Sequence, residues 1–265
     1  MVLVNARVWP SGDRVAVTGS VIRPEDAEGE RIDVGGARVV PGLVDAHVHF
    51  PSWALGRREL RLFSTRSRSE ALERIEAADK PGGGWLRGRG WREEAWPEGE
   101  RPTLAALDEV TGDVPTALRA HDGHTLWVNS AALDAARAST VRGDLAAAAW
   151  AAAGPSGDEP GTLREHAAWD FFDAFAAASP RETLDAVRAA IPAAHAAGVT
   201  GVHDKDGGRG APEAFAALRG EGALTLRVWQ SCRAPTRGAG ATSRRSWTAR
   251  SGRAPLSCWA AGACG

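Results

Sequence analysis

The sequence predicts an α/β fold with parallel strands, preceded by a small β-domain. Strand-like and helix-like segments alternate over residues 41–230, which is the pattern of units that build a parallel sheet. The stretch 31–49 has strand character broken at Gly35-Gly36 and Pro41-Gly42. Its second half is almost wholly apolar, which suits a strand buried on both faces.

The N-terminal residues predict two short strands, at 2–9 and 14–22. The turn-forming residues Ser11, Gly12 and Asp13 separate them. We therefore assign residues 1–40 to a small β-domain.

The rest of the alternation is read from apolar periodicity and turn residues. Helices are expected at 69–78, 104–110, 130–138, 163–177, 179–198 and 212–219, and strands at 85–91, 115–120, 199–203 and 224–229. The best-marked helix starts with Ser179 as N-cap, Pro180 at the first position and Glu182 at the third, and Gly198 ends it.

The composition is that of an ordinary globular protein. Of the 265 residues, 43% are hydrophobic and 25% charged, and the formal net charge is -1, which gives no reason to expect nucleic acid or a membrane surface as partner. No basic leader and no run of about 20 apolar residues is present, so a cytoplasmic location is expected. All three cysteines lie at or after Cys232, so the main body has no cysteine-based site.

The last segment, residues 231–265, departs from the pattern. No acidic residue follows Glu221, several arginines do, and the segment has neither helical nor strand periodicity. Two explanations compete: a disordered basic tail, or a GC-rich gene read out of frame. We treat this segment as separate from the main body at 41–230.

The motif Asp45-Ala46-His47-Val48-His49 is the strongest chemical signal. Alternate residues of a strand point to one face, so Asp45, His47 and His49 project together. Two imidazoles at this spacing can bind one divalent ion, with a carboxylate as outer partner. The alternative is a pair of ordinary core or surface histidines.

Several segments together resemble amidohydrolase family 3, the YtcJ-like branch of the amidohydrolase superfamily. They are PGLVDAHVHF at 41–50, GWLRGRGWREEAW, PTLAALDEVTGDVPTALRAHDGHTLWVNSAAL, GTLRE at 161–165 and AHAAGVTGVHD at 194–204. The resemblance covers about residues 1–230. It implies a partial (β/α)8 TIM-like barrel with a small N-terminal β-sandwich portion. It also implies a metal-activated water that hydrolyses the carbon–nitrogen bond of an amide or N-acyl group in a small molecule.

The resemblance suggests roles for individual residues. His47 and His49 match metal ligands, with zinc as the expected divalent ion. Glu165 matches a third ligand or a residue that orients one, although a solvated carboxylate in the first turn of a helix is an equal alternative. His124 and Asn129 match a polar segment near the substrate pocket, while an ordinary role is favoured for His121.

Three further residues are candidates for substrate binding. Trp91 is either a pocket wall or a packed core residue. His203 and Asp204 end a predicted strand, where barrel enzymes gather their sites.

The family's later lysine, histidines and catalytic aspartate have no match in this sequence, so the catalytic residue is unassigned. Without them the chain is either an incomplete hydrolase or a non-catalytic fragment that binds a metal or a partner. A homo-oligomer is left open.

Overall fold

The computed structural model describes residues 1–9, 12, 14–18, 21–23, 29–97, 99–206, 210–232 and 258–260. Most of the atypical segment 231–265 therefore lies outside the described residues. The choice between a disordered tail and a segment read out of frame falls on the same residues. Its described part includes the strand β15 (Cys258–Ala260), which pairs with β14 (Arg227–Cys232).

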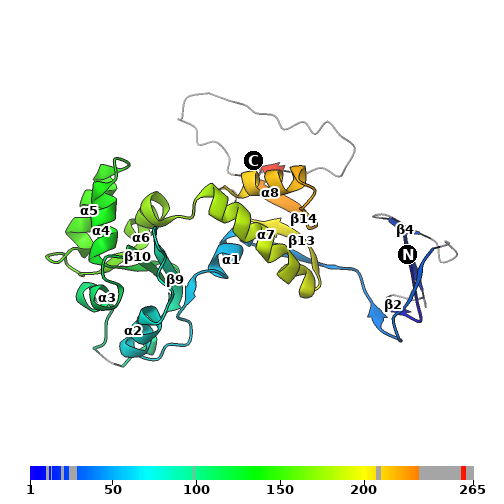
Figure 1. The fold of residues 1–265 in the computed structure, drawn as a ribbon, viewed down its shortest axis with the longest axis horizontal. Helices are drawn as coiled ribbons and strands as arrows, with labels where there is room; N and C mark the ends of the chain where they lie inside the picture. Colours follow the sequence, from blue (N-terminus) through cyan, green and yellow to red (C-terminus); the bar gives the residue numbers. More distant parts are fainter. Residues whose placement is uncertain are drawn as a thin grey trace, which may run out of the picture.

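The N-terminal strands lie together, apart from the helices (Figure 1). One sheet has the order β4-β3-β1-β5, with β1 at Val2–Val4, β3 at Val15–Thr18, β4 at Val21–Arg23 and β5 at Arg31–Asp33. A separate pair joins β2 (Arg7–Val8) to β6 (Arg38–Val39). These strands occupy the stretches where the sequence predicts them.

A four-stranded parallel sheet carries the histidine motif. Its order is β15-β14-β13-β7, with β7 at Leu43–Val48 and β13 at Val199–Asp204. Three helices pack against it, α1 (Phe50–Gly56), α7 (Pro180–Ala196) and α8 (Ala211–Gly220). Their shared core includes Phe50, Val187, Ile191, Val202 and Phe215.

A second, five-stranded sheet is built between β7 and β13 in the chain. Its order is β12-β11-β10-β9-β8, with β8 at Leu60–Arg61, β9 at Leu86–Trp91, β10 at Thr116–Ala120, β11 at Thr125–Val128 and β12 at Thr162–Arg164. Its helical elements are α2 (Arg68–Glu76), η1 (Glu93–Ala95), α3 (Leu104–Thr111), α4 (Ser130–Ala138), α5 (Gly143–Ala153), α6 (Glu165–Phe171) and the π-helical turn η2 (Phe172–Ala176). Figure 1 shows these elements grouped together, beside the parallel sheet and its helices.

The two sheets differ from the single parallel alternation that the sequence predicts. β10 and β11 pair antiparallel because residues 121–124 are too short a connection for a parallel crossover, and β12 then adds antiparallel to β11. The described strands form an open α/β arrangement and no closed barrel.

The expectation that the motif strand is buried on both faces is wrong. β7 is the outer strand of its sheet, and Leu43 and Val44 are 57% and 50% exposed. The physical reason is that α1 and α7 lie beside the strand, while the described residues provide no layer over its remaining surface.

Helix ends follow the local signals in the sequence. The hydroxyl of Ser179 accepts the backbone N–H of Glu182, whose carboxylate accepts the N–H of Ser179, so α7 begins with a capping box as predicted. Gly198, at φ 78°, then turns the chain into β13, a conformation that glycine adopts without strain.

None of the helices in the described ranges is both long enough and apolar enough to span a membrane.

Candidate metal centre

His47 and His49 project from the carboxyl end of β7. Val48, between them, packs against the core formed with α1, α7 and α8, so its two neighbours point away from that core. The ring centroids of the two histidines are 5.8 Å apart and their planes are inclined by 61°. Both residues are exposed, so their ring nitrogens are accessible to an ion from solvent.

Asp206 holds the ring of His49. Its Oδ1 lies 2.7 Å from Nδ1 of His49, and its Oδ2 accepts the backbone N–H of Ser52 at 2.9 Å. The Asp206 side chain is only 10% exposed, whereas that of His49 is 56% exposed. A carboxylate on Nδ1 fixes the tautomer and leaves Nε2 for a metal, which is the usual support for a ligating histidine.

Asp204 is fully buried at the end of β13. Its Oδ1 accepts the backbone N–H of Phe50 and its Oδ2 accepts Nε2 of Gln230, each at 2.7 Å. Burial raises the pKa of Asp204, although hydrogen bonds from Gln230 and Phe50 act in the opposite direction. Asp204 therefore joins β13, α1 and β14 rather than facing open space.

Together, the two aspartates cap α1. The N-cap residue His49 makes no side-chain cap of its own, and Asp204 and Asp206 accept N–H groups of the first turn instead. Between them, the backbone N–H of Lys205 donates to the carbonyl of Val48. The start of α1, and with it His49, is fixed by residues from the distant strand β13.

Asp45 has a different partner from the one that the motif suggests. Its carboxylate accepts the backbone N–H of His47 at 3.0 Å, a local turn-like bond. In the described structure, Asp206 takes the supporting position on His49 that the sequence alone would have given to Asp45.

The donors fit one half of a metal site. Two adjacent imidazoles, one held by a carboxylate, suit zinc or a similar ion. A catalytic zinc site takes three protein ligands and one open position. Within the described ranges, no group of three or more histidine, cysteine, aspartate or glutamate side chains could hold a metal ion.

Glu165 lies against His124 and not with the His47–His49 pair. Its Oε2 is 2.9 Å from Nδ1 of His124, and its backbone N–H donates to the carbonyl of His124. Glu165 has φ 52°, an uncommon value for this residue type. The hydrogen bond that the His124 ring donates to the Glu165 carboxylate raises the pKa of His124. The two residues are together because β11 and β12 are neighbours in the second sheet.

Asn129 and Trp91 are buried and make contacts within the fold. The expected role of Asn129 in substrate binding stays a prediction. The Asn129 side chain is fully buried, caps α4 and donates to Val114 and Thr111. The indole of Trp91 is buried, stacks on Trp96 and donates to the carbonyl of Leu118. Trp91 thus packs in the core, which is one of the two roles that the sequence left open for it.

His203 lies on β13 with its ring against that of Trp229, at a centroid distance of 4.8 Å. It is partly buried, and Trp229 is 37% exposed. His203 is therefore available near the carboxyl end of the parallel sheet, as the sequence predicts for a strand-terminal residue.

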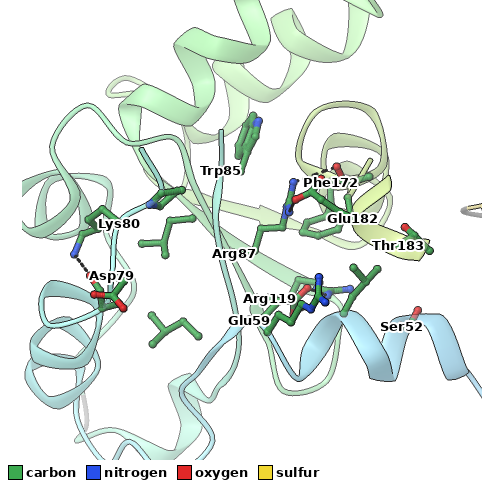
Figure 2. Close-up of a pocket in the computed structure, with 18 of the residues that line it drawn as sticks. Ser52, Glu59, Asp79, Lys80, Trp85, Arg87, Arg119, Phe172, Glu182 and Thr183 are labelled. Carbon is green, nitrogen blue, oxygen red and sulfur yellow. Dashed lines mark hydrogen bonds and ion pairs between the residues drawn. The ribbon is translucent and has the colours of Figure 1, made fainter. Parts of the chain in front are cut away.

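A pocket of about 830 Å³ separates α1 from the second sheet (Figure 2). Figure 2 shows Ser52 on α1, with Arg87 and Trp85 on the strand at the centre and Phe172 beside Glu182. His47 and His49 do not line this pocket, so the histidine pair and the pocket are separate features.

Sequence reasoning missed Asp206. The signal was present, because Asp204-Lys205-Asp206 follows a predicted buried strand that is parallel to the motif strand. Carboxyl ends of adjacent parallel strands meet at one edge, so side chains there are expected to be neighbours.

Comparisons with known proteins agree with the resemblance. The profile of the amidohydrolase family matches residues 30–265, further than the expected limit near residue 230. The putative amidohydrolase YtcJ of Bacillus subtilis (strain 168) is 30% identical over 195 residues, which are 71% of this chain and 37% of that protein. The N-substituted formamide deformylase of Arthrobacter pascens is 34% identical over 134 residues, 48% of this chain and 25% of that protein.

The fold is also similar to a solved structure. The crystal structure of an uncharacterized metal-dependent hydrolase from Pyrococcus horikoshii OT3 superposes with a TM-score of 0.68 at 17% identity, and the match covers 87% of this chain and 48% of that one. The chain thus spans less than half the length of each of these three proteins.

Proposed function

The chain belongs to the amidohydrolase family, and on that premise we propose that it is part of a metal-dependent hydrolase acting on a carbon–nitrogen bond. The substrate is a small molecule with an amide or N-acyl group. The name of the Arthrobacter relative, an N-substituted formamide deformylase, supports this class of substrate. The observation that carries the proposal is the His47–His49 pair with Asp206 on the second ring.

Each of these residues has a defined task. His47 and His49 hold the divalent cation, and Asp206 keeps Nδ1 of His49 engaged so that Nε2 is directed to the ion. A bound cation such as zinc supplies activation of water and polarisation of a carbonyl group. Asp204 fixes the start of α1 and hence the position of His49.

A second candidate is a non-catalytic module that binds a metal, or a partner, through the same histidines. It is favoured by the absence, among the described residues, of a cluster of three potential ligands. Both the hydrolase and the metal-binding module bind a metal, but only the hydrolase turns over a substrate.

Zinc binding and hydrolysis test both candidates on the full chain. Calorimetry should detect zinc binding that weakens about tenfold or more in His47→Ala and His49→Ala, since each loses one of two imidazoles. Asp206→Asn should weaken it by about 10- to 100-fold because the ring of His49 loses its support. His166→Ala, at an exposed position on α6, is the matched control and should bind as the unmodified chain does.

Turnover of N-formyl and N-acetyl amines then separates the candidates. Hydrolysis that is lost with His47→Ala supports the hydrolase, and zinc binding without hydrolysis supports the module. Equal zinc binding by the unmodified chain and His47→Ala would rule out both the hydrolase and the metal-binding module.

A further inference from the structure

Three arginines stand side by side in the second sheet. The strands β8, β9 and β10 are parallel neighbours, and their register pairs Arg61 with Arg89 and Arg89 with Arg119. Neighbouring strands lie about 4.8 Å apart, so residues in one row project from one face as close neighbours. Like charges in such positions destabilise a sheet. A row of three guanidinium groups therefore needs compensation.

Glu59 compensates one of the three. Both of its carboxylate oxygens accept from Nη2 of Arg119, at 2.8 and 3.0 Å, and its side chain is only 8% exposed. Figure 2 shows this pair beside α1. The Arg119 guanidinium also lies over the ring of Phe172, 4.4 Å from its centroid. Its Nε remains buried, with no hydrogen-bond partner among the described residues.

Arg89 is not compensated in this way. It is half-buried, and no hydrogen bond or ion pair to it is found in the part of the chain that the structure describes. Its guanidinium is 6.0 Å from the ring of Phe63 and would collide with any side chain at Gly56. Burial, and then the nearby charge of Arg119, lower the pKa of Arg89, while Glu59 acts in the opposite direction. A partly buried charge without an acceptor is costly and is normally paired.

A pocket of about 300 Å³ opens at this end of the sheet. Arg89, Arg119 and Thr125 line its polar side, and Trp169, Phe172 and Ala168 line its apolar side. Asp122 also borders the pocket, and its Oδ1 accepts the backbone N–H of His124. The pocket thus lies close to the ends of parallel strands, which is where ligands commonly bind to open α/β sheets.

We propose that this pocket binds a small organic carboxylate with an apolar body, whose carboxylate is held by the guanidinium of Arg89, with the charge of Arg119 beside it. A planar guanidinium matches a carboxylate, and the indole of Trp169 and the ring of Phe172 suit an aromatic or branched body. The site does not involve His47 or His49, so it stands or falls independently of the proposed hydrolysis.

Benzoate is the probe for this site on the full chain. Calorimetry and thermal unfolding should show binding that raises Tm by several degrees, and benzamide, which lacks the charge, should have no effect. Arg89→Gln should weaken benzoate binding about tenfold or more, the usual effect of losing a charge-assisted hydrogen bond. Arg181→Gln, whose side chain on α7 is 92% exposed, is the control and should bind benzoate normally.

A second readout separates loss of the ligand site from loss of folding. Without ligand, Arg89→Gln should raise Tm by about 2–4 °C, because it removes an uncompensated charge from the row. Equal responses of the unmodified chain and Arg89→Gln to benzoate would overturn the proposal. So would tighter binding of inorganic phosphate than of benzoate through Arg89, since the occupant would then be a phosphate group.

Discussion

Asp204 shows how one side chain can decide the geometry of a site without entering it. Its two oxygens accept from Phe50 and Gln230 in the buried interior, so α1 and β14 are both tied to β13. Next to it, Oε1 of Gln230 is buried and without a partner in the described part of the chain. Burial also raises the pKa of Asp204. The carboxylate is therefore well placed as an acceptor but unfavourable as a charge.

Replacing Asp204 separates these two effects. Asp204→Asn keeps an acceptor for Phe50 and removes the buried charge, so we expect the free energy of unfolding at pH 7 to rise by about 1 kcal/mol. Its new N–H group can donate to Oε1 of Gln230 once the Gln230 amide turns over, because Nε2 of Gln230 faces this position. Asp204→Ala should lower the free energy of unfolding by about 2–3 kcal/mol, because buried donors lose their acceptor. Urea unfolding measures both. Equal destabilisation by the two variants would contradict this account.

The pH dependence of the free energy of unfolding is a second test of the role of Asp204. A carboxyl group with a raised pKa in the folded state binds its proton more readily there than in the unfolded chain. Its contribution to stability therefore increases as the pH falls from above the raised pKa towards about 3.9, the unfolded value. Asp204→Asn should remove this part of the pH dependence.

The His124–Glu165 pair makes a prediction about titration. The hydrogen bond from the His124 ring to the Glu165 carboxylate is the main cause that raises the pKa of His124 above its ordinary value. In Glu165→Gln we expect the pKa of His124 to fall towards about 6.5, because the neutral amide no longer favours the imidazolium. Titration of the His124 ring by NMR measures this pKa, with His166 as the internal reference. An unchanged midpoint in Glu165→Gln would show that another group raises the pKa of His124.

At the scale of elements, α7 links the second sheet to the parallel one. Arg87 on β9 donates to the carbonyls of Ala176 and Ala177 and to the carboxylate of Glu182, in the first turn of α7 (Figure 2). Glu182 also completes the capping box with Ser179. Burial opposes its ionisation, but the hydrogen bonds from Arg87 and Ser179 lower the pKa of Glu182 to about 2.

This link predicts loss of stability in acid. A carboxylate with a lowered pKa contributes stability above about 4.5, and the contribution is lost as the pH falls from there towards 2. Glu182→Gln should therefore flatten the decrease in the free energy of unfolding across this range, measured by urea unfolding at several pH values. Glu213→Gln, on α8, is the control, and an equal effect of both variants would contradict the link.

At the scale of the whole molecule, the parallel sheet ends at β7 with apolar residues in solvent. Leu43, Val44 and Val40 are each at least half exposed, and Trp229 is 37% exposed. An outer strand with exposed apolar side chains offers unpaired backbone groups to another chain. We therefore expect this surface to favour self-association.

Light scattering after size-exclusion chromatography tests that consequence. We expect the mass to increase with concentration, and Leu43→Lys to reduce the increase, because a charge on an outer strand opposes pairing between edges. Val141→Lys, at a 57% exposed position between α4 and α5 and outside the strands, is the matched control. A concentration-independent monomer for the unmodified chain would contradict the expectation.

The local predictions correspond closely to the structure because they rest on local signals. The residues at 179–182 predict the start of α7. The motif places His47 on β7, whereas His49 lies just after the strand, at the N-cap of α1. The pairing of strands does not follow from local signals in the same way. The same alternating pattern is compatible with one sheet or two, and the short connection at 121–124 favours an antiparallel pair that breaks the series.

The sequence by itself predicted the family, the two histidines and many of the elements, since periodicity, capping and short motifs depend on neighbouring residues. It did not predict α1, α5, β8, β11 or β12. Only the tertiary structure decided which distant side chains meet one another. It placed Asp206 on His49, Glu165 on His124, Asn129 in the core, and Arg61, Arg89 and Arg119 in one row. The physical reason is that these contacts depend on strand register and helix packing, which are properties of the folded chain as a whole.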